Sequence, residues 1–157
     1  AAQRATRVRL CEQDLRAELG VVNGRQCRFT DGTVEVSHTV TSGGDAADLV
    51  ERFRAVVQEC PGPWLDPRLP TGGGPVRREI TGFYPLPADL GVDGSGAVVR
   101  SRNGVGGTDT VVIVLGQGDL VSSLSISGPV GSDFDVVDPA IEAAAERLRS
   151  VQSPAGP

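Results

Sequence analysis

The residues in this sequence best suited to covalent or metal-centred chemistry are three cysteines, Cys11, Cys27 and Cys60, and a single histidine, His38. A structural zinc site needs four nitrogen or sulfur ligands, and these commonly include a CxxC pair. The four residues are scattered along the chain and no CxxC occurs, so we expect no metal site. A catalytic thiol would need an activating base, and His38 is the sole histidine that could supply it. These residue types therefore favour a disulfide.

The helical periodicity around the cysteines suggests how they pair. Cys11 shares a 3.6-residue stripe with Leu15 and Leu19 in a predicted helix over residues 10–20, and Cys60 ends the apolar stripe of a second predicted helix. If both helices cover one sheet, the two sulfur atoms point into shared space, which favours Cys11–Cys60. Cys27 is the competing partner of Cys60, because the start of its predicted strand can lie near the end of the following helix. Either bridge implies an oxidising, extracytoplasmic setting.

The second helix is predicted over residues 45–60. Asp45 is a suitable N-cap, since its carboxylate can accept hydrogen bonds from free amides of the first turn, and Pro61 ends the helix. Its apolar stripe consists of Leu49, Phe53, Val56, Val57 and Cys60.

The rest of the chain alternates predicted strands with turns rich in glycine and proline. Strands or hairpins are predicted over 26–40, 76–83, 96–102, 108–116 and 119–128, a long loop over 61–75, a turn or short helix over 84–91, and a third helix over 138–150. No βαβ unit repeats, so the predicted fold class is α+β: an antiparallel β-sheet packed with about three helices and bridged by a disulfide. We expect one domain over 10–150, a flexible N-terminal segment over 1–9 and a flexible tail over 151–157.

Composition limits the classes of partner. The formal net charge of −5 argues against nucleic acid as a partner, and no run approaches the roughly 18 apolar residues of a membrane span. All fifteen cationic residues are arginine, which indicates GC-rich codon usage. The sequence lacks methionine, so we expect a processed piece of a longer precursor whose membrane anchor lies upstream.

Five residues are candidates for ligand binding. Trp64, Arg77, Arg78 and Tyr84 lie in or beside the proline- and glycine-rich loop, where aromatic and cationic side chains would suit an acidic or glycan-like ligand. The alternative is that Trp64 packs beneath the loop as a lid on the core. His38 lies among valines of a predicted strand; it either contacts ligand or is a core histidine whose nitrogen atoms are hydrogen-bonded.

Motifs of standard enzymes and cofactor sites are missing. The sequence contains no GxSxG, HExxH or GxGxxG opening a helix after a strand, and the acidic run Asp133, Asp135 and Asp138 lacks EF-hand spacing. We therefore expect no cofactor, no metal and no catalytic activity.

Several segments resemble one known family. The sequence has a cysteine that opens a short predicted helix ending in "LG", then a strand, and then the segments "GGDAADLVERFRAVVQECPG", "VVIVLGQGDLVSSLSISG" and "AIEAAAERLRS". These features are similar to those of sensor-type domains of actinobacterial lipoproteins and of mycobacterial serine/threonine receptor kinases. The resemblance covers roughly residues 8 to 150. It implies an extracytoplasmic α+β domain with a cleft and a bridge between Cys11 and Cys60. This sequence departs from the kinase version in lacking a C-terminal cysteine pair and in carrying Cys27.

The expected function is a non-catalytic extracytoplasmic binding or sensor domain of an actinobacterial envelope protein, either a lipoprotein or a receptor ectodomain. Its partner would be a small-molecule or cell-wall ligand, or an envelope protein. One alternative is a protein-interaction or structural envelope domain without a small ligand. Another is a secreted hydrolase with an unfamiliar site, which requires a serine or aspartate held against His38.

Overall fold

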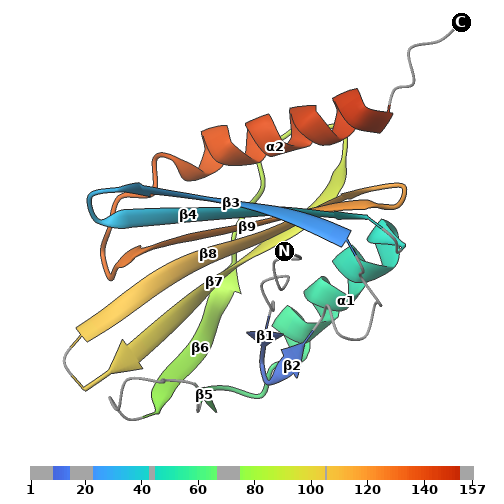
Figure 1. The fold of residues 1–157 in the computed structure, drawn as a ribbon. Coiled ribbons are helices and arrows are strands. Elements are labelled where there is room, and N and C mark those ends of the chain that lie inside the picture. Colours follow the sequence, from blue (N-terminus) through green and yellow to red (C-terminus); the bar gives the residue numbers. More distant parts are fainter. Residues whose placement is uncertain (1–8, 15–22, 43–44, 67–74, 105, 153–157) are drawn as a thin grey trace, which may run out of the picture.

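The computed structural model describes residues 9–14, 23–42, 45–66, 75–104 and 106–152. Their fold is α+β: a seven-stranded antiparallel sheet with one helix on each face, plus a separate two-stranded ribbon (Figure 1). The strand order of the large sheet is β3-β4-β9-β8-β7-β6-β5. Neighbours in this order are mostly successive in the chain, as in a sheet built from hairpins. The predicted α+β class is confirmed, with two helices in the described residues rather than about three.

The large sheet is built from long strands at its centre and a short strand at one edge. Its strands are β3 (Asn23–Asp31), β4 (Val34–Ser42), β5 (Trp64–Asp66), β6 (Val76–Phe83), β7 (Asp93–Asn103), β8 (Gly106–Gln117) and β9 (Leu120–Pro129). The β3–β4 turn contains Gly32 at φ +57°, in the left-handed region that glycine adopts without steric cost. The predicted strands are all present, and β5 is an additional strand within the segment predicted as loop.

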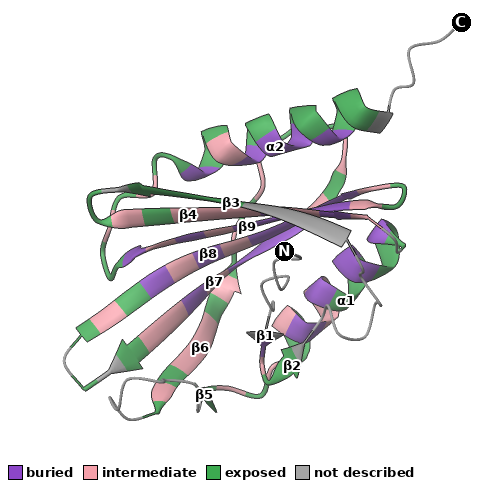
Figure 2. Cartoon of the chain, in the orientation of Figure 1, coloured by how far each residue is buried: buried purple, intermediate pink, exposed green. Residues whose placement is uncertain are grey.

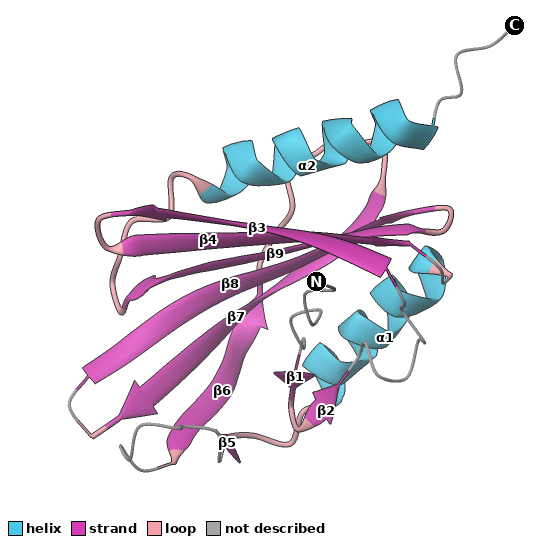
Figure 3. Cartoon of the chain, viewed as in Figure 1, coloured by secondary structure: helices cyan, strands magenta, loops and turns pink. Residues whose placement is uncertain are grey.

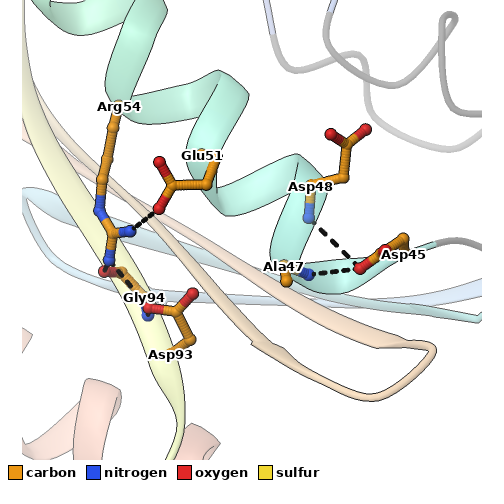
Figure 4. A network of polar contacts seen from close by, with 7 residues as sticks. All are labelled: Asp45, Ala47, Asp48, Glu51, Arg54, Asp93 and Gly94. Carbon is orange, nitrogen blue, oxygen red and sulfur yellow. Dashed lines mark hydrogen bonds and ion pairs between the residues drawn. The ribbon is translucent and has the colours of Figure 1, made fainter.

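Helix α1 (Ala46–Glu59) begins and ends where its sequence signals predict. The Asp45 carboxylate accepts hydrogen bonds from the amides of Ala47 at 3.0 Å and Asp48 at 3.3 Å (Figure 4). Arg54 anchors the helix to β7, because its Nη2 donates to Asp93 Oδ1 and to the carbonyl oxygen of Gly94, both at 2.8 Å. The helix is therefore fixed to the sheet by polar contacts as well as by its apolar stripe.

Strand alternation divides the apolar residues between two cores, one on each face of the sheet. Against α1 the core includes Phe53, which is fully buried, together with Ala97 and Val114. Against α2 (Val137–Gln152) it includes Ile113 and Ile126 of the sheet, with the helix residues Val137, Ile141, Ala145 and Leu148. The buried stripe of each helix faces the sheet, and the opposite stripe is exposed (Figure 2).

Residues 10–14, predicted as the start of a helix, instead form a hairpin. Strands β1 (Arg9–Leu10) and β2 (Gln13–Asp14) pair antiparallel. The two turn residues, Cys11 and Glu12, have φ values of 51° and 67°, as in a two-residue hairpin turn with both central residues left-handed. Residues 15–20 of the predicted helix lie outside the described residues.

A disulfide joins Cys11 to Cys60, with 5.7 Å between their Cα atoms. It ties the β1–β2 turn to the C-terminal end of α1. The favoured pairing is confirmed, although Cys11 reaches Cys60 from a turn and not from a helix face. Cys27 is free and exposed on the edge strand β3.

Three further boundaries differ from the sequence prediction. Arg9 lies in β1, within the segment expected to be flexible. Helix α2 continues through Gln152, two residues into the expected tail. It also begins at Val137, one residue before the predicted cap Asp138, whose carboxylate accepts a hydrogen bond from Tyr84 Oη at 2.7 Å.

Candidate functional site

Strands β6 and β7 hold a groove of about 310 Å3 that is lined mainly by arginine. Its lining residues are Arg77, Arg78, Glu79, Arg100 and Arg102. These residues lie toward the ends of the strands that extend away from both helices (Figure 3). Arg77, Arg100 and Arg102 lie on one face of the sheet together with Glu79, and strand alternation places Arg78 on the other face. Three guanidinium groups therefore gather on one face of a chain whose net charge is −5.

The inner part of the groove is a cross-strand row in which one arginine lies between two carboxylates. Arg100 lies between its register partners Glu79 on β6 and Asp109 on β8. Its Nε donates to Asp109 Oδ1 at 2.8 Å and its Nη2 to Oδ2 at 3.0 Å, a bidentate geometry. Asp109 is buried, and the hydrogen bonds from Arg100 lower the pKa of its carboxyl despite the opposing effect of burial. The carboxylate therefore stays ionised and fixes the position of Arg100.

The outer part of the groove is a second row that carries two cations and no carboxylate. Arg77 and Arg102 are register partners, flanked by Leu65 on β5 and Gly107 on β8. Opposite residues of an antiparallel pair have Cβ atoms about 4.5–5.5 Å apart, and like charges at that spacing destabilise the sheet. Within the part of the chain that the structure describes, no carboxylate lies within ion-pair distance of either side chain. Both arginines are exposed.

Apolar side chains flank this outer row. Leu65 is 56% exposed and Val130 is 44% exposed. Val130 donates its backbone amide to the carbonyl oxygen of Gly107 at 3.2 Å. A Cβ added to Gly107 would meet Val130 Cγ2 at 2.8 Å and Arg102 Cγ at 3.7 Å, so Val130 lies beside Arg102 on the groove side. The outer row can therefore contact a ligand through both charge and apolar surface.

Of the predicted ligand-binding residues, Arg77 and Arg78 line this groove. Trp64 is 8% exposed and packs in the α1 core. This position agrees with the alternative interpretation, in which Trp64 is a lid on the core. Its register partner is Arg78, and strand alternation turns Arg78 toward that same face, away from Arg77 and Arg102.

Tyr84 lies apart from the groove, against α2. Its hydroxyl donates to Asp138 Oδ1 at 2.7 Å. Burial and this carboxylate raise the pKa of Tyr84 to about 12. The hydroxyl thus stays protonated, and its contact links the β6–β7 connection to the first turn of α2.

His38 also lies apart from the groove, on the face covered by α2. Its Nε2 lies 2.7 Å from Ser122 Oγ on the neighbouring strand β9. Burial, followed by the charge of Arg147, lowers the pKa of His38. The hydrolase alternative required a serine against this histidine, but Ser122 is only 1% exposed. The contact between His38 and Ser122 therefore satisfies the hydrogen-bonding groups of these two side chains in the layer between sheet and helix, as expected of a core histidine.

Sequence reasoning missed Arg100, Arg102 and Asp109. The signal was present, because Arg100 and Arg102 alternate with Ser101 in a predicted strand and so share one face. In the described residues no group of three histidine, cysteine, aspartate or glutamate side chains could hold a metal ion. Across the same residues, no helix has both the length and the apolar content of a membrane span.

The fold is similar to that of the extracellular domain of PknH from Mycobacterium tuberculosis, with a TM-score of 0.62 and 11% sequence identity over 87% of this chain and 69% of that chain. A protein of unknown function from Pseudomonas aeruginosa, PA94, gives a TM-score of 0.37 at 11% identity, over 86% of this chain and 83% of that chain. No protein-family model and no curated protein matches the sequence. At these identities the likeness to the PknH domain establishes a shared fold.

Proposed function

We propose that this chain is a non-catalytic extracytoplasmic binding or sensor domain of an actinobacterial envelope protein, which captures an acidic ligand in the arginine groove. The observation that carries the proposal is the outer row, where Arg77 and Arg102 face each other and neither has a carboxylate within ion-pair distance among the described residues. Such a pair costs stability in the free protein. A bound anion removes that cost, so ligand binding gives the arrangement a physical purpose.

Two observations support the extracytoplasmic setting. One is the Cys11–Cys60 disulfide, a bond that persists in oxidising compartments. The other is the fold shared with an extracellular domain. The proposed anchor, a lipid or a transmembrane helix, would precede the chain and hold the domain at the envelope.

A second candidate function is protein interaction at the envelope, and it rests on strand β3. This nine-residue strand is an edge of the large sheet, and Phe29 on it is 64% exposed. Edge strands present unpaired backbone groups to which another chain can add. The partner would then be an envelope protein.

The compartment is tested with the native protein in intact host cells. A membrane-impermeant maleimide should label Cys27, the exposed free thiol, without cell lysis, and a Cys27→Ser variant should not be labelled. Labelling that appears only after lysis would place the chain in the cytoplasm and overturn the extracytoplasmic proposal.

A further inference from the structure

We infer that the outer row of the groove is a binding site for a phosphoryl group, in which Arg77 and Arg102 clamp the oxyanion. This inference rests on the proposed function, because it names the class of acidic ligand that the groove takes. The inference concerns only the phosphoryl end of the ligand. A soluble phosphomonoester and the headgroup of an anionic phospholipid present the same phosphoryl chemistry.

Charge is the first argument for a phosphoryl group. The outer row carries two formal positive charges from Arg77 and Arg102, whereas the inner row holds one arginine, Arg100, against two carboxylates, Glu79 and Asp109, and so offers no excess positive charge to an anion. A single carboxylate would balance one of the two arginines of the outer row, which have no ion-pair partner among the described residues. A phosphomonoester carries about −1.5 to −2 charges at neutral pH and three acceptor oxygens, so one such group can balance both Arg77 and Arg102.

Geometry is the second argument. A guanidinium group presents its donors as a rigid planar fork that pairs bidentately with phosphate oxygens. Two such forks rise from directly opposed backbone positions, so a tetrahedral group between them can accept from both sides at once. Gly107 continues the same row without a side chain, and Val130 occupies the space beside Arg102 where a side chain would lie.

The size and surroundings of the groove limit the ligand further. Its volume of about 310 Å3 is at the lower end of ligand pockets, which suits a headgroup better than a large ligand enclosed whole. Leu65 and Val130 offer apolar surface on either side of the arginine pair. The organic part of the ligand next to the phosphoryl group would lie against these two side chains.

The test is a titration of the complete chain at low ionic strength and neutral pH, followed through the side-chain Nε–Hε NMR signals of arginine. The probes are methyl phosphate, succinate as a dicarboxylate of similar charge, and short-chain phosphatidic acid below its micelle concentration. Arg77→Gln and Arg102→Gln are compared with Arg52→Gln, which removes an exposed arginine of α1 that pairs with Asp48.

We expect methyl phosphate to bind more tightly than succinate and to shift the signals of Arg77 and Arg102. Either groove variant should weaken binding roughly tenfold or more, since each removes charge-assisted hydrogen bonds, whereas Arg52→Gln should bind normally. Melting temperatures of all variants verify that they fold. Tighter binding of phosphatidic acid than of methyl phosphate would identify the lipid as the source of the phosphoryl group, and equal binding would identify a soluble phosphomonoester.

Two outcomes would overturn the inference, and they differ in what they mean for the proposed function. If succinate binds as tightly as methyl phosphate and still requires Arg77 and Arg102, the groove is a general acidic-ligand site and only the phosphoryl assignment fails. If no probe binds, or if binding is unchanged in both groove variants, the acidic-ligand function of the groove fails together with the inference.

Discussion

Removal of the Cys11–Cys60 bridge should destabilise the domain strongly. The two residues are 49 positions apart in the sequence, and the chain-entropy relation for a closed loop of that length gives a stabilisation of about 4 kcal/mol at 25 °C. The double variant Cys11→Ala, Cys60→Ala should lose about that free energy of unfolding. For a chain of this size, the loss corresponds to a melting temperature lower by roughly 8–16 °C.

The assay is urea unfolding followed by the fluorescence of the single tryptophan, Trp64, which is buried in the α1 core. The unbridged chain should also unfold with a larger denaturant slope, because its unfolded state is more expanded. Cys27→Ser is the matched control, and this exposed, free thiol should change stability by less than about 0.5 kcal/mol. A double variant no less stable than the control would refute the bridge as a major source of stability, and a large loss in the control would point to the Cys27–Cys60 alternative.

Three further predictions concern single positions. Burial and a nearby arginine of α2 lower the pKa of His38 in the folded chain, so below pH 6.5 the unfolded chain binds more protons than the folded one. The free energy of unfolding should therefore fall as pH drops from 6.5 toward the folded-state pKa. In urea titrations, His38→Gln should flatten this pH dependence. Gly116→Ala should lower the free energy of unfolding by about 1–3 kcal/mol, because the new Cβ would meet Ala46 Cβ at 2.8 Å and the Ala46 carbonyl oxygen at 3.1 Å. Thermal melts measure this loss, and the control is Gly106→Ala, whose new Cβ would meet nothing within 4 Å. Asp45→Ala should lower the free energy of unfolding by about 0.5–2 kcal/mol through loss of the helix cap. A change in melting temperature no larger than that of Gly106→Ala would argue against a stabilising cap.

Local signals predicted the elements whose stability is encoded locally. The cap Asp45 and the breaker Pro61 bound α1 to within one residue of its observed ends. The strand run from β6 to β9 followed from alternation and glycine-rich turns. The start of the chain was mispredicted because the spacing of Cys11, Leu15 and Leu19 fits a helix, while Cys11 and Glu12 occupy a left-handed turn held by a long-range bridge.

The groove could not be predicted from the sequence because it depends on register between strands. Arg77 and Arg102 are 25 positions apart in the chain, and their opposition exists only in the β6–β7 pairing. The same pairing places Glu79 beside Arg100, so one row contains carboxylates that balance its arginine and the neighbouring row contains arginines alone. Sequence reasoning identified Arg77 and Arg78 by proximity to a loop, but strand alternation separates these two side chains onto opposite faces.

The most direct test of an extracytoplasmic, disulfide-tied binding domain is a non-reducing peptide map, by mass spectrometry, of the protein purified from its native host. The predicted result is one peptide pair linked through Cys11 and Cys60, with Cys27 outside that bridge. Three reduced thiols would contradict the oxidising compartment, and a Cys27–Cys60 link would contradict the fold at the end of α1.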